Sequence, residues 1–149
     1  MVRKANINDI KDIHKLINHF AGRNKMLARS LSELYGTTRD FLVYESKGKV
    51  CGCCALHLDW ESLAEIKSLA VWESSQNKGI GRRLLKASLK EAKKLAITKV
   101  FALTYEVNFF KKHGFGEVDK SELPHKIWSE CLNCPKFPNC DETALVINL

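Results

Sequence analysis

The chain has no apolar run that approaches the ~20 residues of a membrane-spanning helix. Asn, Asp and Lys interrupt the N-terminus from the start, which is not the layout of a signal peptide. We therefore expect a cytoplasmic protein that does not act in a membrane. Internal repeats and low-complexity linkers are also missing. At 149 residues, with 45% hydrophobic and 28% charged residues, the chain has the length and composition of one globular domain, expected over residues 1–149.

Positive charge is concentrated in one segment. Residues 76–112 contain ten Lys or Arg against two Glu, a net charge of +8, so the rest of the chain carries −1 of the total +7. Such a segment suits a polyanionic ligand, although Lys90, Lys93 and Lys94 are equally consistent with a solvated helix face. It lacks interleaved aromatic residues and a groove-reading motif, so nucleic acid is not the expected partner.

Periodicity and turn residues predict a mixed order of helices and strands. Asn8 is expected to cap the first helix, with an apolar face after it. In a long helix over 79–96, we expect Leu85, Leu89, Ala92 and Ala96 on one buried face. The expected strands are 2–5, 41–46, 50–58, 64–71, 99–104, 116–118 and 143–148, and the two shorter later helices are 30–35 and 107–113.

The segment from Gln76 to Gly81 reads Gln-Asn-Lys-Gly-Ile-Gly and lies between a predicted strand and the long helix. Glycine allows the open backbone dihedrals of a tight turn, and the first N–H groups of a helix have no partners within it. A turn of this kind binds phosphate. Its spacing differs from the dinucleotide fingerprint and from the nucleoside-triphosphate loop.

The spacing Gln-x-x-Gly-x-Gly, after a strand that ends Leu-Ala-Val, resembles the pyrophosphate loop of the GNAT N-acetyltransferases. The segment Lys111-Lys112-His113-Gly114-Phe115 resembles the helix-end motif of the same family, in which the glycine ends the helix. The predicted order β-α-α-β-β-β-α-β-α-β-β is that of the GNAT fold over nearly the whole chain. The resemblance implies an α+β, three-layer fold with a mixed central sheet flanked by helices.

The resemblance also implies that acetyl-CoA is the acetyl donor. Backbone N–H groups at the end of the strand 64–71 should bind the pantetheine arm and the thioester oxygen, and the glycine turn should bind the pyrophosphate. The residues expected to bind acetyl-CoA are Leu69, Ala70, Val71, Gln76, Asn77, Lys78, Gly79, Ile80, Gly81 and Arg82.

Three stretches look like the short, single-domain N-acetylglutamate synthases of arginine biosynthesis. They are 26–30 (Met-Leu-Ala-Arg-Ser), 50–57 leading to 64–71, and 123–128 together with Cys131, Cys134, Cys140 and the following Asp-Glu. The third is the most specific, because a cysteine-containing insert, here 119–142, is unusual for a GNAT domain. The resemblance implies direct attack of the glutamate α-amine on acetyl-CoA in a ternary complex. It leaves open a homodimer. Because the sequence starts directly at the first expected strand, we expect no amino-acid-kinase-like domain in front of it.

Two residues are candidates for proton transfer. Glu65 is the candidate general base, acting through a water, and the alternative is that it only pairs with Lys67. Many GNAT enzymes use a tyrosine as the acid four residues before the helix-end glycine, but Phe110 stands there. Tyr105 is the nearest hydroxyl and the candidate acid; otherwise it packs at a sheet edge and the thiolate leaves unassisted.

Glutamate presents two carboxylates, for which a guanidinium is the natural receptor. Arg29 matches the family's substrate-binding arginine, and His57 lies where relatives contact the acceptor. Lys136 in the insert is a candidate second cation. The alternative for Arg29 is a surface arginine, and the alternative for His57 is a structural histidine. The insert that contains Lys136 departs from the longer relatives, so their carboxylate partners are left open here.

The six cysteines form two groups. Cys51, Cys53 and Cys54 lie on an apolar strand and are expected to be reduced core residues. The insert cysteines have the spacing Cys-x-x-Cys-x5-Cys, with His125 upstream, which leaves a zinc site, a disulfide or free thiols open.

Glutamate N-acetylation is therefore the predicted function. A GNAT enzyme for another amine, such as another amino acid, a polyamine or a protein terminus, is the first alternative. A non-catalytic acetyl-CoA-binding module is the second, and the absence of the usual tyrosine favours it. A zinc-dependent nucleic-acid binder is the most remote.

Overall fold

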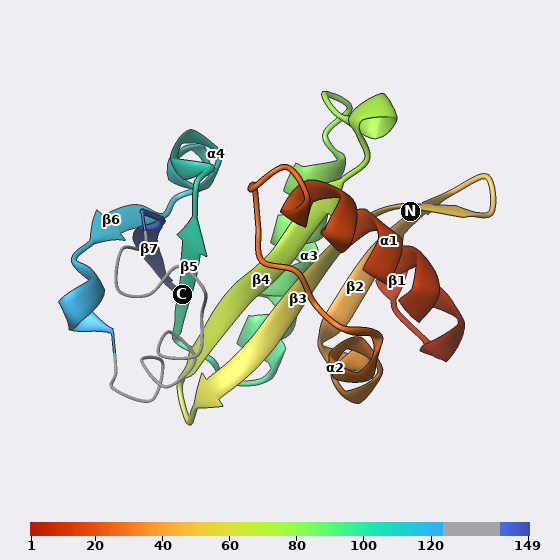
Figure 1. Cartoon of the computed structure of the whole chain (residues 1–149). Coiled ribbons are helices and arrows are strands. Elements are labelled where there is room, and N and C mark those ends of the chain that lie inside the picture. The colour runs from red at the N-terminus through yellow and green to blue at the C-terminus, as the bar shows by residue number, and fades with distance from the viewer. Residues whose placement is uncertain (124–140) are drawn as a thin grey trace.

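The computed structural model describes residues 1–123 and 141–149 (Figure 1). Its strands are β1 (Val2–Lys4), β2 (Phe41–Ser46), β3 (Lys49–Trp60), β4 (Leu63–Val71), β5 (Lys99–Thr104), β6 (Gly116–Val118) and β7 (Thr143–Asn148). The α-helices are α1 (Ile10–Ala21), α2 (Leu31–Gly36), α3 (Ile80–Lys94) and α4 (Val107–Lys112), and the short 3₁₀ turns are η1 (Ile7–Asp9), η2 (Thr38–Asp40), η3 (Glu73–Ser75) and η4 (Lys120–Glu122). The predicted order of elements is confirmed.

The described strands form one mixed sheet in the order β1-β2-β3-β4-β5-β7-β6. β4 and β5 pair in parallel, and the other described neighbours pair antiparallel. The parallel pair arises because α3 carries the chain from β4 across one face of the sheet to β5, the connection that parallel strands require. The predicted insert, residues 119–142, lies between β6 and β7, and its residues 124–140 are outside the described part of the chain.

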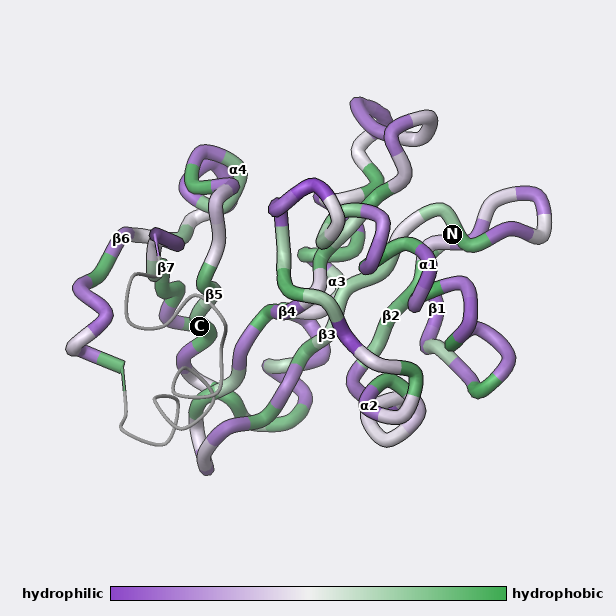
Figure 2. Tube along the Cα trace, in the orientation of Figure 1, coloured by the Kyte–Doolittle hydropathy of each residue, from purple (hydrophilic) through white to green (hydrophobic). Residues whose placement is uncertain are grey.

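Two helical layers cover the sheet because successive side chains of a strand point to opposite faces. Cys54 and Leu56 of β3 pack with α3, whereas Cys53 and Ala55 pack with α1 and α2. Figure 1 shows α1 and α2 on one side of β2–β4 and α3 on the other. Hydrophilic residues lie in the turn between β2 and β3 and between β4 and α3 (Figure 2). The three-layer prediction is confirmed.

The first helix begins with a different cap from the one expected. Asn6 is the N-cap residue of η1, the turn that leads into α1: its side chain accepts a hydrogen bond from Asn8 N–H, and Asp9 bonds back to Asn6 N–H. This reciprocal pair satisfies two free N–H groups at once. Asp9, the N-cap residue of α1 itself, makes no side-chain cap bond. The prediction of Asn8 was wrong because η1 precedes α1 and moves the start of the helical run.

The C-terminal end of α3 was also predicted too late. The helix ends at Lys94, and Ala96 takes a left-handed backbone conformation with φ 64°. The Ile97 N–H then bonds back to the Ala92 carbonyl, which satisfies a carbonyl group at the helix end. Leu85 and Ala92 are buried as expected, but Ala96 is exposed.

Candidate active site

A cleft opens where β4 and β5 separate. Within the described residues, Leu63–Glu65 of β4 pair with β5, and the two strands then diverge (Figure 1). The cleft has a volume of about 1350 Å³. Its walls come from β4, the α1–α2 connection, the start of α3, the end of β5 and α4.

The backbone of β4 bends at a β-bulge along this cleft. Lys67 pairs with Ala55 and Ala70 pairs with Cys53, so two β4 residues oppose one residue of β3. Ser68 lies in the left-handed region with φ 53°. Beyond Glu65, β4 has lost its β5 partner, so its backbone donors on that side border the cleft. Such fixed donors stabilise charge that develops on a carbonyl oxygen.

The glycine loop, residues 76–82, forms the cleft wall at the N-terminus of α3. Gly79 is the N-cap residue with φ +79°, a conformation that glycine adopts without strain, and no side chain caps the helix. The Gln76 side chain donates to the Val71 carbonyl at 3.0 Å and ties the loop to β4. The loop lines the cleft except at Lys78. Gly81 lies within α3 and is not among the residues with positive φ, so the expected open dihedral is wrong there.

Glu65 lines the cleft near the point where the strands separate. Its side chain is 8% exposed, and its Oε1 lies 3.8 Å from Lys67 Nζ, whose side chain is 14% exposed. The pairing of Glu65 with Lys67 is therefore present, and it coexists with access to the cleft. A nearly buried carboxylate beside one cation and an open backbone edge has the surroundings of a general base.

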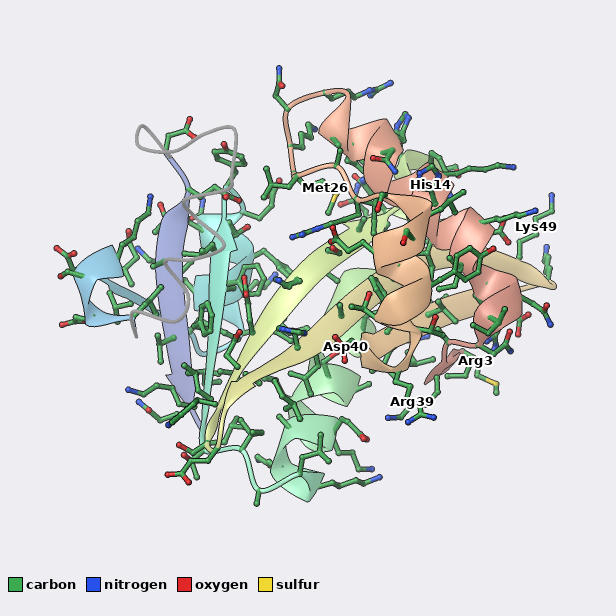
Figure 3. The ribbon with its side chains drawn as sticks, turned by 60° about the horizontal axis from the view of Figure 1, so that its bottom comes forward. Arg3, His14, Met26, Arg39, Asp40 and Lys49 are labelled. Atoms are coloured by element: carbon green, nitrogen blue, oxygen red, sulfur yellow. The ribbon has the colours of Figure 1, made fainter. Side chains whose placement is uncertain are left out.

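The α1–α2 connection borders the cleft opposite β4. Arg29 lines the cleft, and its Nη1 lies 2.9 Å from Glu33 Oε2. The Asn18 side chain fixes the backbone there, donating to the Arg29 carbonyl at 3.0 Å and accepting from its N–H at 3.3 Å. Met26 packs against the α1 core and also lines the cleft, and Figure 3 shows it on this connection.

Two described candidate residues, Tyr105 and His57, are not brought to the cleft lining. The Tyr105 hydroxyl donates to Asp141 Oδ1 at 2.6 Å, outside the residues that line the cleft. His57 is paired through Nδ1 with Asp40 Oδ2 at 2.9 Å, also outside the lining. Asp40 lies at the end of η2 (Figure 3). Lys136 lies outside the described residues.

The end of α4 has the geometry that its motif predicts. Gly114 has φ +97°, and its N–H bonds to the Lys111 carbonyl while Phe115 N–H bonds to the Phe110 carbonyl. This pair of bonds is the Schellman arrangement. The Phe110 ring, with its centroid 5.1 Å from that of Phe115, is buried and lines the cleft where many GNAT enzymes have a tyrosine.

Sequence reasoning missed several polar residues of the cleft. Lys25 lines it from the α1–α2 connection and Lys67 from β4, and Lys86, Lys112 and His113 line it near the glycine loop. Lys67 was considered only as a partner of Glu65, although the period of two in a strand predicts that both side chains share a face. Burial, and then Arg82 and other nearby cations, lower the pKa of His113.

The described cysteines are free, as predicted: Cys53 and Cys54 are buried and Cys51 is partly buried. Cys131, Cys134, Cys140 and His125 lie outside the described residues, so the zinc and disulfide alternatives stay open. Within residues 1–123 and 141–149, no cluster of His, Cys, Asp or Glu has the arrangement of a metal site. No helix in that part of the chain is long and apolar enough to cross a bilayer.

The chain is similar to known acetyltransferases. It is 43% identical over 148 residues to an uncharacterized N-acetyltransferase of Chlorobaculum tepidum, covering 99% of this chain and 96% of the relative. It is 35% identical over 133 residues to an amino-acid acetyltransferase of Mycobacterium tuberculosis, covering 87% and 76%. The crystal structure of N-acetylglutamate synthase from Neisseria gonorrhoeae, complexed with coenzyme A and N-acetyl-glutamate, superposes with a TM-score of 0.91 at 28% identity. That match covers all of this chain and 35% of the other.

A family model also matches the segment that contains the glycine loop and most of the predicted elements. The model of the Acetyltransferase (GNAT) family matches residues 8–115, most of the chain. The resemblance predicted from the sequence is confirmed: the chain belongs to the Acetyltransferase (GNAT) family.

Proposed function

We propose that this protein transfers the acetyl group of acetyl-CoA to the α-amine of an amino acid, and that the amino acid is L-glutamate. One observation carries the proposal: a single cleft contains the glycine loop, the carboxylate of Glu65 and the cations Arg29 and Lys67. A dianionic acceptor and a phosphate-bearing donor each find complementary charge there. The relatives named amino-acid acetyltransferase, and the synthase complexed with coenzyme A and N-acetyl-glutamate, support the same activity.

Acetyl-CoA would lie along the cleft with its pyrophosphate on the glycine loop. Because no side chain caps α3, the first N–H groups of that helix are available to phosphate oxygens, and the helix dipole adds to the attraction. The thioester would lie at the β4 bulge, with its carbonyl oxygen on backbone N–H groups from 69–71. Lys86, Lys112 and Arg82 supply positive charge near the loop.

Glu65 would accept, through a water, the proton that the glutamate ammonium loses. The amine then attacks the thioester carbonyl carbon, a C–N bond forms, and the C–S bond breaks as the oxyanion collapses. Glu65 passes the first proton to solvent through the same water; it then accepts the second proton from the attacking nitrogen, and CoA leaves as the thiolate. We assign no acid from the described cleft lining to this step, because Phe110 replaces the tyrosine and Tyr105 is bonded to Asp141; a thiolate is a moderately good leaving group without assistance.

Arg29 and Lys67 would bind the two carboxylates of glutamate. Arg29 offers a planar guanidinium that suits one carboxylate, and Lys67 offers a point charge next to Glu65. Glu33 holds the Arg29 guanidinium in the free protein at 2.9 Å, so the acceptor would compete with an existing ion pair. Of the other residues predicted for the acceptor, His57 would act from outside the cleft lining, and Lys136 lies outside the described residues.

Glutamate acetylation would place the protein in arginine biosynthesis, in the cytoplasm, where glutamate and acetyl-CoA are both present. The test is acetyl-CoA consumption with each of the twenty amino acids as a separate acceptor, followed by chromatography because thiol dyes react with free cysteines. Turnover with glutamate far above the others is expected. Turnover with another amine would retain the family and discard glutamate; acetyl-CoA binding without turnover would indicate a binding module, the alternative that Phe110 favours.

A further inference from the structure

Cys53 of β3 lies on the face of the sheet that α1 and α2 cover, and it contacts the β4 bulge. Its thiol is fully buried and donates a hydrogen bond to the Ser68 carbonyl, with the sulfur 3.3 Å from the oxygen. Burial raises the pKa of the Cys53 thiol, and the backbone hydrogen bond from Ala70 opposes that rise. The thiol therefore remains protonated near neutral pH and serves as a donor to the Ser68 carbonyl.

The contact between Cys53 and Ser68 lies where the regular ladder between β3 and β4 is broken. Ser68 and Leu69 oppose the single residue Cys54, and Ser68 takes the left-handed conformation with φ 53°, which is strained for a non-glycine residue. A bulge of this kind persists when its surroundings determine it. Cys53 is thus bonded through its sulfur to Ser68 on one side of Leu69, and is the strand partner of Ala70 on the other.

We propose that Cys53 is a positioning residue: its thiol fixes the Ser68–Ala70 backbone so that the bulge donors face the thioester of bound acetyl-CoA. This inference rests on the proposed function. Cys53 has no access to the cleft, yet the proposal gives it an effect on how acetyl-CoA is held for reaction. Cys53 does not line the cleft, so a change in substrate kinetics on its removal would have to pass through the β4 backbone.

The neighbouring cysteine provides a matched control. Cys54 is equally buried, but it faces the α3 layer, where the Ser88 hydroxyl donates to its sulfur at 3.3 Å. Removing either thiol deletes one buried sulfur from the same strand, with the bond to the Ser68 carbonyl for Cys53, and with the bond from Ser88 and a longer one to the Ala55 carbonyl at 4.0 Å for Cys54. Only the Cys53 thiol is bonded to the bulge backbone.

The experiment compares Cys53→Ala, Cys53→Ser and Cys54→Ala in the full chain. Both alanine variants should lower Tm similarly. Cys53→Ala should lower kcat/KM for acetyl-CoA about tenfold relative to Cys54→Ala, the equivalent of one hydrogen bond, and should accelerate amide hydrogen exchange at 68–71. Cys53→Ser, which retains a donor and an acceptor, should recover most of both losses.

Two results would overturn the proposal: equal kinetic loss in the two alanine variants, or exchange at 68–71 that is unchanged in Cys53→Ala. The exchange measurement needs no substrate. It therefore decides the role of Cys53 in the bulge even if the wild-type protein acetylates an amine other than glutamate, an outcome that the acceptor screen detects separately.

Discussion

Lys67 Nζ lies 3.8 Å from Glu65 Oε1, two residues apart on β4, and both side chains are nearly buried beside the cleft. This pair gives the proposed base a counter-charge without removing it from the cleft lining. A nearby cation favours the ionised carboxylate, whereas burial favours the neutral acid. The pair thus combines the two influences that adjust a carboxylate for proton transfer.

Glu65→Gln should reduce kcat for glutamate acetylation by about 10²–10⁴-fold, the usual contribution of a general base. The affinity for acetyl-CoA, measured by calorimetry, should change little, because the amide is nearly isosteric and the glycine loop is untouched. Glu61→Gln, at an exposed position in the turn between β3 and β4, is the control and should retain full turnover. Unchanged kcat in Glu65→Gln would remove Glu65 as the base.

Arg29→Ala should raise KM for glutamate by about 10–100-fold, the effect of losing a charge-assisted hydrogen bond, and should leave KM for acetyl-CoA nearly unchanged. Steady-state kinetics with each substrate varied in turn measures both constants. Glu33→Gln is the matched control: it frees the guanidinium from its ion pair at 2.9 Å and should lower KM for glutamate or leave it unchanged. A parallel rise in both KM values in Arg29→Ala would contradict a carboxylate contact.

The elements of this fold were readable from the sequence because each has a strong local signal. β5, β6 and β7 have the predicted bounds, since alternation and flanking turn residues define them. The glycine loop could be predicted as well, because a strand, two glycines and a basic helix follow one another along the chain. Errors of one or two residues arose at helix ends, where Asn6 replaces Asn8 as the cap and Ala96 takes a glycine-like conformation.

The candidate site was less predictable because its parts come from distant segments. The sequence gives no signal that the Tyr105 hydroxyl bonds to Asp141, since 36 positions separate the two residues. Nor does it show that His57 is held by Asp40 outside the cleft lining. Lys67 could have been found from strand alternation alone. The bulge at Ser68 has no such signature, because nothing in a Lys-Ser-Leu sequence requires a positive φ.

Tyr105→Phe should change kcat by less than about threefold, because a proton donor outside the cleft lining does not reach the leaving thiolate. The expected loss is the hydrogen bond to Asp141, worth about 1 kcal/mol of stability. Rapid-quench measurement of the acetyl-transfer step separates chemistry from product release. A loss of 100-fold in that step would establish Tyr105 as the acid and would require a movement that brings it to the cleft.

Gly79→Ala should raise KM for acetyl-CoA, since its φ of +79° is strained for any residue with a Cβ. An added Cβ meets no atom within 4 Å, so the effect is conformational and not a clash. A strain of about 1–2 kcal/mol corresponds to a five- to thirtyfold weaker affinity if relief of the strain opens the loop. Gly36→Ala, also in open space but at the end of α2 without a positive φ, should leave the affinity unchanged. Equal effects of the two substitutions would contradict a role for the loop conformation.

The contact between His57 and Asp40 should make stability fall as the pH rises. The hydrogen bond to Asp40 raises the pKa of His57 above its ordinary value of 6.5, while burial and Lys67 oppose the rise. Because the folded pKa exceeds the unfolded one, the stabilisation is fully present below about pH 6.5 and is lost as the pH rises through the folded pKa. Asp40→Asn removes the carboxylate at 2.9 Å and should flatten this part of the profile, whereas Asp12→Asn, at an exposed position on α1, should not. Thermal unfolding between about pH 6 and pH 9 measures the difference; identical slopes in the wild type and Asp40→Asn would mean that the pair does not couple protonation to folding.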